Sequence, residues 1–230
     1  MSKESFKAFL KRKDIEFSAK RYGIDALGAM AQGLFASLLI GTILSTIGTQ
    51  FNIAIFNEMG DFAKTVAGSA MAVAIGFALK APPLVLFSLV AVGWAANSLG
   101  GAGGPLAVLL ITIVSAELGK AVSKETKVDI LVTPLTVIIS GALLSHFCAP
   151  AIGVAASYVG NAIMWATEQR PFMMGIIVSV VVGIALTLPI SSAAICAALS
   201  LTGLAGGAAV AGCCAQMIGF AVMSFKENRW

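Results

Sequence analysis

The segment NSLGGAGGPLAV, residues 97–108, places four glycines within five positions and follows them with a proline. It separates two strongly apolar runs, residues 83–98 and 105–119. A phosphate-binding loop is excluded, because GxxxxGK requires a lysine after the glycines and GxGxxG would need glycine where Leu106 stands. A flexible linker fits poorly here, since backbone exposed to lipid leaves polar groups unsatisfied. Two interpretations remain: a turn in water, or an unwound segment inside a helical bundle that faces a cavity.

The composition of the whole chain points to a membrane protein. Of 230 residues, 58% are hydrophobic and only 11% are charged, well below the roughly 25% charged residues of ordinary globular proteins. Long uncharged runs match the about 20 helical residues needed to cross a bilayer, and the sequence lacks strand-like alternation. The predicted fold is therefore all-α, a polytopic membrane helical bundle of about seven to eight apolar segments. Broken or re-entrant helices are expected near residues 98–105 and 200–207.

The expected spans follow the apolar runs. They are residues 24–51, 63–79, 83–98, 105–119, 130–147, 151–167, 172–188 and 206–224, with a shorter piece at 191–201. A polar loop is expected at residues 51–62, and the sequence HFCAP is expected to interrupt the chain between the fifth and sixth spans. The third and fourth spans are each only about 24 Å long as helices. This pair therefore either crosses a thin bilayer or forms a re-entrant hairpin.

Basic residues are concentrated at the N-terminus, where seven of the fifteen Lys and Arg precede residue 22 among interspersed apolar side chains. Residues 1–23 are predicted to form a basic amphipathic segment on the cytoplasmic membrane surface, and residues 24–230 the membrane domain. A solvated basic tail is the alternative for the first segment. The loops expected on the outer side, 51–62, 99–104 and 147–150, contain no Lys or Arg. Counting crossings places these residues inside: Lys80, Lys120, Lys124, Lys127, Arg170, Lys226 and Arg229.

An echo of the glycine stretch occurs in the second half of the chain. SLGGAGGPLAV, residues 98–108, aligns without gaps to SLTGLAGGAAV, residues 200–210, with six identities in eleven positions. Paired interrupted segments are the best sequence indication of a transporter binding site near the bilayer midplane. The candidate substrate-binding residues at the two breaks are Asn97, Ser98, Gly101, Gly103, Gly104, Ser200, Gly203 and Gly206.

Further candidates are polar residues within or beside the apolar runs, because ionisable groups in a bilayer are costly and often functional. Glu117 lies three positions before Lys120 on the same helical face, so it is either a coordinating carboxylate or half of an interfacial ion pair. His146, the only histidine, is either a ligand or proton-relay group or a satisfied interfacial side chain. The amides of Asn161 and Gln216 are able to bond sugar hydroxyls.

The sequence shows no nucleophile with a base and an orienting partner. Its four cysteines form no CxxC motif, and no histidine lies at ligand spacing from them. We therefore expect neither a metal nor a cofactor and no catalytic constellation in this chain. Nucleic-acid binding is not expected from so short a basic patch.

Two segments carry a family resemblance. WAANSLGGAGGPLAVLLITIVSAELGKAVSKETKVDILVTPLTVIISG, residues 94–141, and GLAGGAAVAGCCAQMIGFAVMSFKENRW, residues 203–230, resemble the IIC-like membrane proteins of the bacterial phosphotransferase system (PTS), in the branch grouped with PfoR-type toxin regulators. The most specific motifs are AELGK, TKVDILVTP and SFKENRW. Members of this branch usually continue beyond ENRW, so the chain is expected to be shortened at its C-terminus.

The resemblance implies a permease for a sugar or sugar-like solute that works by alternating access at a site between broken helices. It further implies a multi-pass protein of the bacterial inner membrane with a cytoplasmic N-terminus, which contacts lipid and forms a homodimer. Separate IIA and IIB proteins would supply phosphate, so this chain is at most the membrane translocation subunit of a sugar phosphotransferase system. The alternative is a membrane-embedded sensor or transcription-linked regulator that does not transport.

Overall fold

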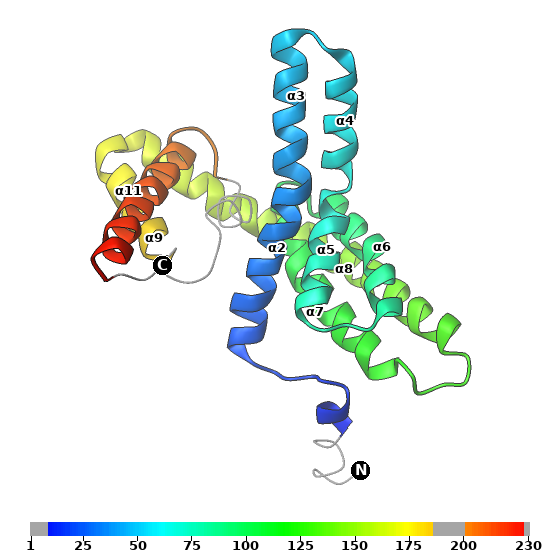
Figure 1. Ribbon diagram of the computed structural model, residues 1–230. Helices are drawn as coiled ribbons and strands as arrows, with labels where there is room; N and C mark the ends of the chain where they lie inside the picture. The colour runs from blue at the N-terminus through cyan, green and yellow to red at the C-terminus, as the bar shows by residue number, and fades with distance from the viewer. Residues whose placement is uncertain (1–8, 186–200, 228–230) are drawn as a thin grey trace.

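The computed structural model describes residues 9–185 and 201–227. Every regular element in these two ranges is helical, which confirms the all-α prediction. Within them, five helices are long and apolar enough to cross a membrane: Arg21–Phe51, Pro83–Gly100, Gly104–Val122, Asp129–Gln169 and Gly203–Lys226. Shorter apolar helices, Ala67–Ala78 and Pro171–Ile184, accompany them. The protein is a multi-pass membrane helical bundle (Figure 1).

The first arm of the bundle is a long rod made of α2 (Ala26–Leu34) and α3 (Ile40–Phe51). A π-helical turn, Phe35–Leu39, joins these two helices without interrupting the rod. The chain then returns along the rod: α4 (Ala54–Thr65) packs beside α3, and α5 (Ala67–Ala78) packs beside α2 (Figure 1). The end of α5 is thereby brought back to the level at which the rod begins.

The polar loop expected at residues 51–62 is mostly helix, so that prediction is wrong. The turn is short because Asn52 ends α3 in the left-handed conformation, with φ of 57°. Close packing then holds α4 against α3. A Cβ on Gly60 would collide with Ser45 Oγ and would lie 2.6 Å from the carbonyl oxygen of Gly41. Helix pairing through small residues outweighs the polar composition of this segment.

The glycine stretch forms the predicted break. It separates α6 (Pro83–Gly100) from α7 (Gly104–Val122), and a single 3₁₀ turn, Gly101–Gly103, joins them. Gly101 has a φ of 53°, a conformation that glycine adopts far more readily than other residues. Pro105 lies in the first turn of α7, where its missing N–H has no helical partner to lose. The two helices are about 27–29 Å long, close to the thickness of a hydrocarbon core of about 30 Å.

Helix α8 (Asp129–Gln169) is one continuous helix of 41 residues, so the interruption expected at HFCAP is wrong. Pro134 and Pro150 both lie inside it. A proline removes one backbone donor and crowds the preceding turn, but membrane helices tolerate this where neighbouring helices support the freed groups. Here α6 and α7 pack along α8, and we attribute its continuity to this support.

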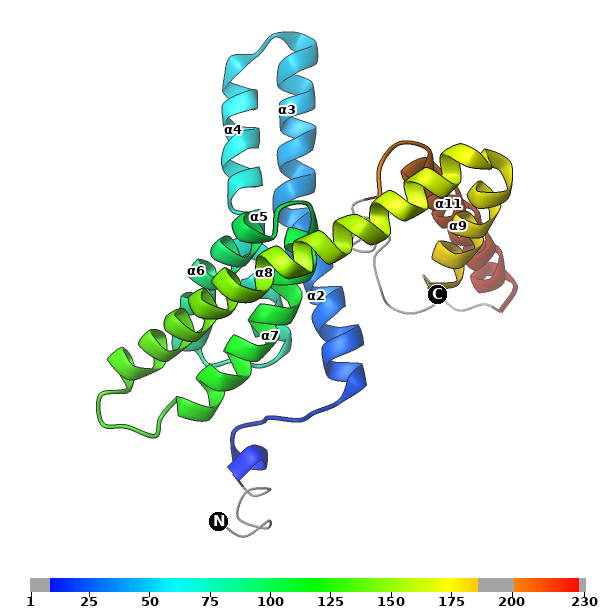
Figure 2. The same cartoon turned by 180° about the vertical axis from the view of Figure 1, so that it is seen from behind.

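The far half of α8 extends past the α6–α7 hairpin and meets α9 (Pro171–Ala185) and α11 (Gly203–Glu227), as Figure 2 shows. Val178 and Val182 of α9 pack with Ala209 of α11. The second glycine cluster begins α11, with Gly203 at a φ of 55°. Apart from Leu201, the short piece expected at residues 191–201 lies outside the described residues.

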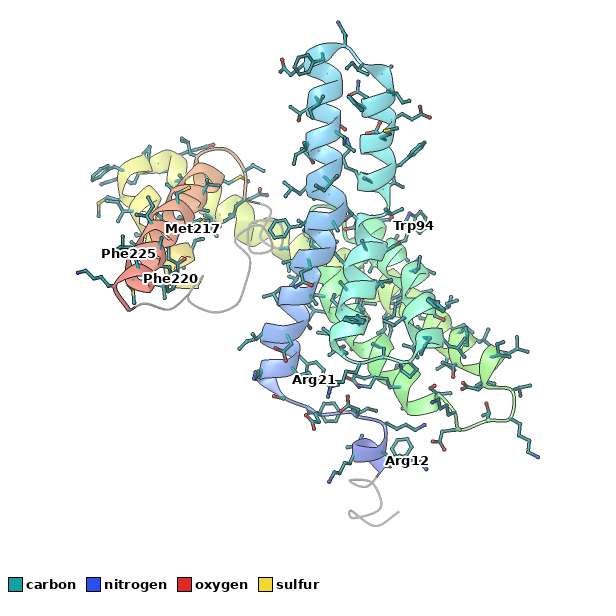
Figure 3. All side chains as sticks on the ribbon, viewed as in Figure 1. Arg12, Arg21, Trp94, Met217, Phe220 and Phe225 are labelled. Carbon is teal, nitrogen blue, oxygen red and sulfur yellow. The ribbon has the colours of Figure 1, made fainter. Side chains whose placement is uncertain are left out.

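The main core lies between α2, α5, α6, α7 and α8, where the fully buried apolar side chains include Met30, Met71, Ile75 and Leu89. Large apolar side chains also cover the outside of the bundle. Figure 3 shows four of them on the exterior, and each is at least 45% exposed: Trp94, Met217, Phe220 and Phe225. An apolar exterior of this extent is typical of a lipid-facing surface.

Candidate functional site

Two hollowed regions lie near opposite ends of the α6–α7 hairpin. The first, which we name the break groove, is formed by the glycine break and one face of α8. Its lining residues are Leu99, Gly100, Gly101, Pro150, Gly153, Val154, Tyr158 and Asn161. The second lies where the N-terminal residues meet the ends of α5 and α7. Both regions are assembled from segments far apart in the sequence.

Backbone approaches backbone at the break groove. A Cβ on Gly153 of α8 would collide with the carbonyl oxygen of Gly100, and one on Gly103 would lie 2.8 Å from the Cβ of Ala156. A larger side chain at either position would push α8 away from the break. Small residues therefore bring α8 directly against the turn between α6 and α7, as in other close helix contacts in membranes.

The break groove has the size and polarity of a small-molecule site. Its volume is about 540 Å³, within the range of about 300–1,000 Å³ typical of ligand pockets. Its polar side chains are the phenol of Tyr158 and the amide of Asn161, both exposed. The break adds backbone groups, because the last carbonyls of one helix and the first N–H groups of the next lack intrahelical partners. Donors and acceptors without a net charge suit a neutral, hydroxyl-rich solute.

The residues predicted at the first break divide into two groups. Gly101 lines the groove, and a Cβ there would meet no atom within 4 Å. Gly103 and Gly104 serve close packing: a Cβ on Gly104 would lie 2.6 Å from Oδ1 of the half-buried Asn97. Ser98 is exposed on α6 and is not among the groove residues. Only Gly101 of this set therefore faces the hollow.

The second break contacts the same helix further along. Thr202, just before α11, has its Oγ1 3.2 Å from Sδ of Met164 on α8. Met164 follows Gly153 by about 16 Å along the helix axis at about 1.5 Å per residue. Helix α8 thus connects the two breaks, and the polar groove residues Tyr158 and Asn161 lie between these contact points.

The remaining candidate residues lie outside the break groove. Gly203 begins α11, Gly206 packs against the chain just before that helix, and Ser200 lies outside the described residues. Gln216 is half-buried in α11, and its Nε2 has no hydrogen-bond partner among the described residues. His146 is exposed on α8. The break groove contains none of these side chains.

Glu117 lies in the ion pair that the i,i+3 spacing predicts. Its Oε2 is 3.1 Å from Nζ of Lys120, and Tyr22 donates its hydroxyl to Oε1 at 3.1 Å. Lys120 is only 2% exposed and also donates to the carbonyl oxygens of Asp14 at 2.6 Å and Leu79 at 3.0 Å. Of the two alternatives for Glu117, the structure contains the ion pair. Lys120 anchors three segments at one point.

Residues 9–20, which we name the N-terminal strap, lie across the ends of α5 and α7. Figure 3 shows Arg12 and Arg21 at this end of the molecule. Arg21 donates to Oδ2 of Asp14 at 2.7 Å and to the carbonyl oxygen of Leu79 at 2.9 Å. The bond from the guanidinium is the largest of the influences that lower the pKa of Asp14. This carboxylate therefore stays charged at neutral pH and holds the strap to the bundle.

A second set of bonds ties the strap to the loop between α7 and α8. Arg12 and Lys13 contact Oε1 of Glu125 at 2.7 and 2.6 Å, and Lys13 also donates to the carbonyl oxygen of Ser123. The hydrogen bond from Lys13 is the main cause that lowers the pKa of Glu125. The strap is thus bonded to α7 and to the loop that follows α7, and Arg21 and Lys120 link it to the carbonyl oxygen of Leu79 at the end of α5.

The sequence held a signal for the groove face of α8 but none for the strap contacts. Pro150, Val154, Tyr158 and Asn161 recur at helical spacing, so they share one face of a continuous helix. Tyr158 belongs to this face but was not among the predicted polar candidates. Apart from the bond between Arg21 and Asp14, the strap contacts join residues separated by more than a hundred positions, 106 for the Lys120–Asp14 bond, and no local pattern indicates such pairs.

The described residues contain no group of three or more His, Cys, Asp or Glu that could hold a metal ion. Comparison with known protein families matches residues 24–230 to the family described as "Phosphotransferase system, EIIC". Comparisons with curated proteins and with solved structures find no significant match. The family match covers both glycine breaks and every membrane helix that the structure describes, except residues 21–23 at the start of the first one.

Proposed function

Because this chain belongs to the EIIC family of the phosphotransferase system, we propose that it is the membrane permease component for a sugar or sugar-like solute. The break groove is the observation that carries the proposal. It is an uncharged hollow of about 540 Å³ in which a glycine break faces Tyr158 and Asn161 of α8. Sugars present many hydroxyls and no charge, so they match uncharged donors and acceptors of this kind.

In this proposal, solute hydroxyls bond to the Asn161 amide, the Tyr158 phenol and the backbone near Gly101. Alternating access requires α8 and the α6–α7 hairpin to move relative to each other around the bound solute. The contact between Gly100 and Gly153 favours such movement, because no side chains interlock there. The strap bonds at the opposite end keep the hairpin attached while the groove opens or closes.

We place the protein in a bacterial inner membrane with the strap in the cytoplasm. The bonds of Lys120 and Arg21 to Leu79 gather basic residues from the strap, the end of α5 and the end of α7 at one end of the bundle. Basic residues near membrane ends are retained on the cytoplasmic side. Separate IIA and IIB proteins would supply phosphate from that side, and a second copy of the chain would complete a dimer.

Purified protein in proteoliposomes tests the proposal. Among radiolabelled hexoses, pentoses and sugar alcohols, at least one should show saturable binding or uptake. Asn161→Ala and Tyr158→Phe alter exposed side chains and should weaken binding about tenfold, equivalent to about 1.4 kcal/mol, without changing the melting temperature. His146→Ala is the matched control, because His146 is exposed on the same helix outside the groove.

The results of this experiment distinguish the proposed permease function from the proposed location of the binding site. If no sugar in the panel binds to the intact protein, the permease proposal fails. If a sugar binds and its affinity survives Asn161→Ala but falls in His146→Ala or Gln216→Leu, the permease proposal stands. The site would then belong to those other predicted residues instead of the break groove.

A further inference from the structure

The second hollow, which we name the basic pocket, lies at the end of the bundle opposite the break groove. The N-terminal strap, the turn after α5 and the loop after α7 enclose a volume of about 360 Å³ there. Five cationic and two acidic residues line it, which gives a formal charge of +3. They are Arg12, Lys13, Lys80, Lys120 and Lys124, with Asp14 and Glu125. A concave surface with this excess of one sign concentrates counter-ions.

Most of these charges are already paired within the protein. Glu125 contacts Arg12 and Lys13, and Lys120 lies 3.1 Å from the Oε2 of Glu117. Lys80 and Lys124 differ, because neither ammonium forms an ion pair in the part of the chain that the structure describes. Two ammonium groups without an ion pair therefore share one pocket, and the nearby Asp129 carboxylate is held by the backbone N–H of Lys124 at 2.7 Å.

Backbone conformation places three of the pocket residues just after helix ends. Asp14, Lys80 and Lys124 have φ values of 53°, 56° and 62°. They are three of the four non-glycine residues with positive φ in the described ranges, and all three line the basic pocket. Helices commonly end on a residue in this left-handed conformation, and the backbone bonds from Ala81 N–H to the Gly76 carbonyl and from Ile15 N–H to the Leu10 carbonyl close two of these ends. The helix ends therefore bring Lys80 and Lys124 to the same pocket.

The surroundings place these ammonium groups at the edge of the membrane. Phe77, one helical turn before Lys80, is 76% exposed, and Ile130, at the start of α8, is 70% exposed. The pocket thus lies between lipid-facing apolar side chains and the charged strap, at the depth where lipid headgroups are found. The abundant anionic group at that depth is phosphate, and lysine binds phosphate as a compact point charge.

We propose that the basic pocket binds a phosphate group through Lys80 and Lys124. The group belongs to the headgroup of an anionic phospholipid or to a free phosphate compound, since both present the same oxygens. Its binding joins the strap, the end of α5 and the end of α7. Because the unfolded chain has no such pocket, occupancy stabilises the folded protein.

Thermal unfolding of the purified chain in an uncharged detergent tests the proposal with three probes. Dihexanoyl phosphatidic acid presents phosphate on a lipid, inorganic phosphate presents it alone, and dihexanoyl glycerol presents the lipid alone. We expect phosphatidic acid to raise the Tm saturably and dihexanoyl glycerol to leave it unchanged. An equal response to inorganic phosphate would assign the pocket to free phosphate compounds. No saturable response to either phosphate probe would overturn the proposal.

Paired variants connect this response to the basic pocket. Lys80→Gln with Lys124→Gln should reduce the apparent affinity for the phosphate probe at least about tenfold. Lys20→Gln with Lys127→Gln removes the same charge from residues outside the pocket and should preserve the response. If both double variants lose the response equally, net charge alone accounts for the binding and the proposal is overturned.

A second double variant, with glycine at both lysine positions, keeps the test decisive if the glutamine double variant does not fold. Glycine adopts positive φ readily, so Lys80→Gly with Lys124→Gly should be at least as stable as the wild type without ligand. It should nevertheless lose the response to phosphatidic acid. A glycine variant that responds like the wild type would overturn the proposal.

Discussion

The two ends of the α6–α7 hairpin are attached to the rest of the bundle in opposite ways. At the break groove, Gly100 meets Gly153 backbone to backbone, and the lining residues carry no charge. At the other end, Lys120 and Arg21 reach carbonyl and carboxylate oxygens of the strap and of α5. The first contact depends on the volume of side chains. The second depends on charge, and at its exposed edge also on pH and salt.

This difference matches two tasks that a permease must combine. A smooth uncharged contact lets helices shift around a neutral solute, whereas directional bonds to a buried ammonium keep segments in register. If the comparison is right, removing charge is harmful mainly at the strap end, and adding volume is harmful mainly at the break groove. Variants at each end, with matched controls, test this division.

The largest effect is expected from Lys120→Met. This change leaves Glu117, whose side chain is 11% exposed, without its ion-pair partner and frees the carbonyl oxygen of Asp14. Breaking one side of a buried ion pair typically costs about 3–5 kcal/mol. We expect a loss of that order in the free energy of unfolding, measured in mixed detergent micelles by tryptophan fluorescence.

A double variant identifies the source of this loss. Lys120→Met with Glu117→Gln removes both charges, so it should recover part of the stability lost in Lys120→Met alone. If the double variant is less stable than Lys120→Met by the full cost of Glu117→Gln alone, the two side chains do not interact energetically. The ion pair would then not be the anchor of this end.

The next largest effect is expected from added volume at the break groove. In Gly153→Val the new side chain collides with the carbonyl oxygen of Gly100, and overpacking of this kind costs about 1–3 kcal/mol or more. Gly175→Ala in α9 is the control, because a Cβ there meets no atom within 4 Å. It should be neutral or stabilising by up to about 1 kcal/mol. Equal behaviour of the two variants would refute the close contact of α8 with the break.

Much of the fold was predictable because its signals are local. Apolar length indicates membrane helices, and four glycines followed by a proline indicate where α6 ends and α7 begins. The i,i+3 spacing of Glu117 and Lys120 also indicates an ion pair within one helix. The break and the ion pair are each set within about one or two helical turns, and the apolar length within about five or six.

The errors arose where tertiary packing outweighs a local signal. The polar loop expected at residues 51–62 lies largely within α4, because glycines let this helix lie directly on α3. Pro150 suggests an interruption, yet α8 continues through it beside α6 and α7. The second error hid only the place of Pro150 in the break groove, since Val154, Tyr158 and Asn161 all lie within the expected span 151–167. The strap bonds, which link distant positions, had no sequence signal.

Acid should loosen the strap without affecting the break groove. The lowered pKa of Asp14 means that its contribution to stability is fully present above its unfolded pKa of about 3.9 and is lost as the pH falls through the folded value. The protection of amides 9–20 against hydrogen exchange, taken relative to the intrinsic rate at each pH, should therefore stay constant between about pH 5 and 8 and fall below about pH 4. The protection near Gly101 should show no step in the same range.

The control for this pH effect is Asp14→Asn, which cannot titrate at this position. It should show lower protection of the strap amides at neutral pH and a smaller further loss of protection in acid. Because the pKa of Glu125 is also lowered, a residual acid response is expected in this variant. An unchanged acid response would place the titrating group elsewhere.

The smallest effect is expected at the exposed edge of the strap. The side chains of Arg12 and Glu125 are 62% and 39% exposed, and ion pairs in water contribute little because solvent screens them. Glu125→Gln should therefore change the melting temperature only slightly, and high salt should reduce the difference from the wild type further. Glu58→Gln is the control, since Glu58 is exposed and lies outside every ion pair that the structure describes. If Glu125→Gln destabilises the protein as much as Lys120→Met, the exposed contacts carry the attachment and the buried lysine is not its anchor.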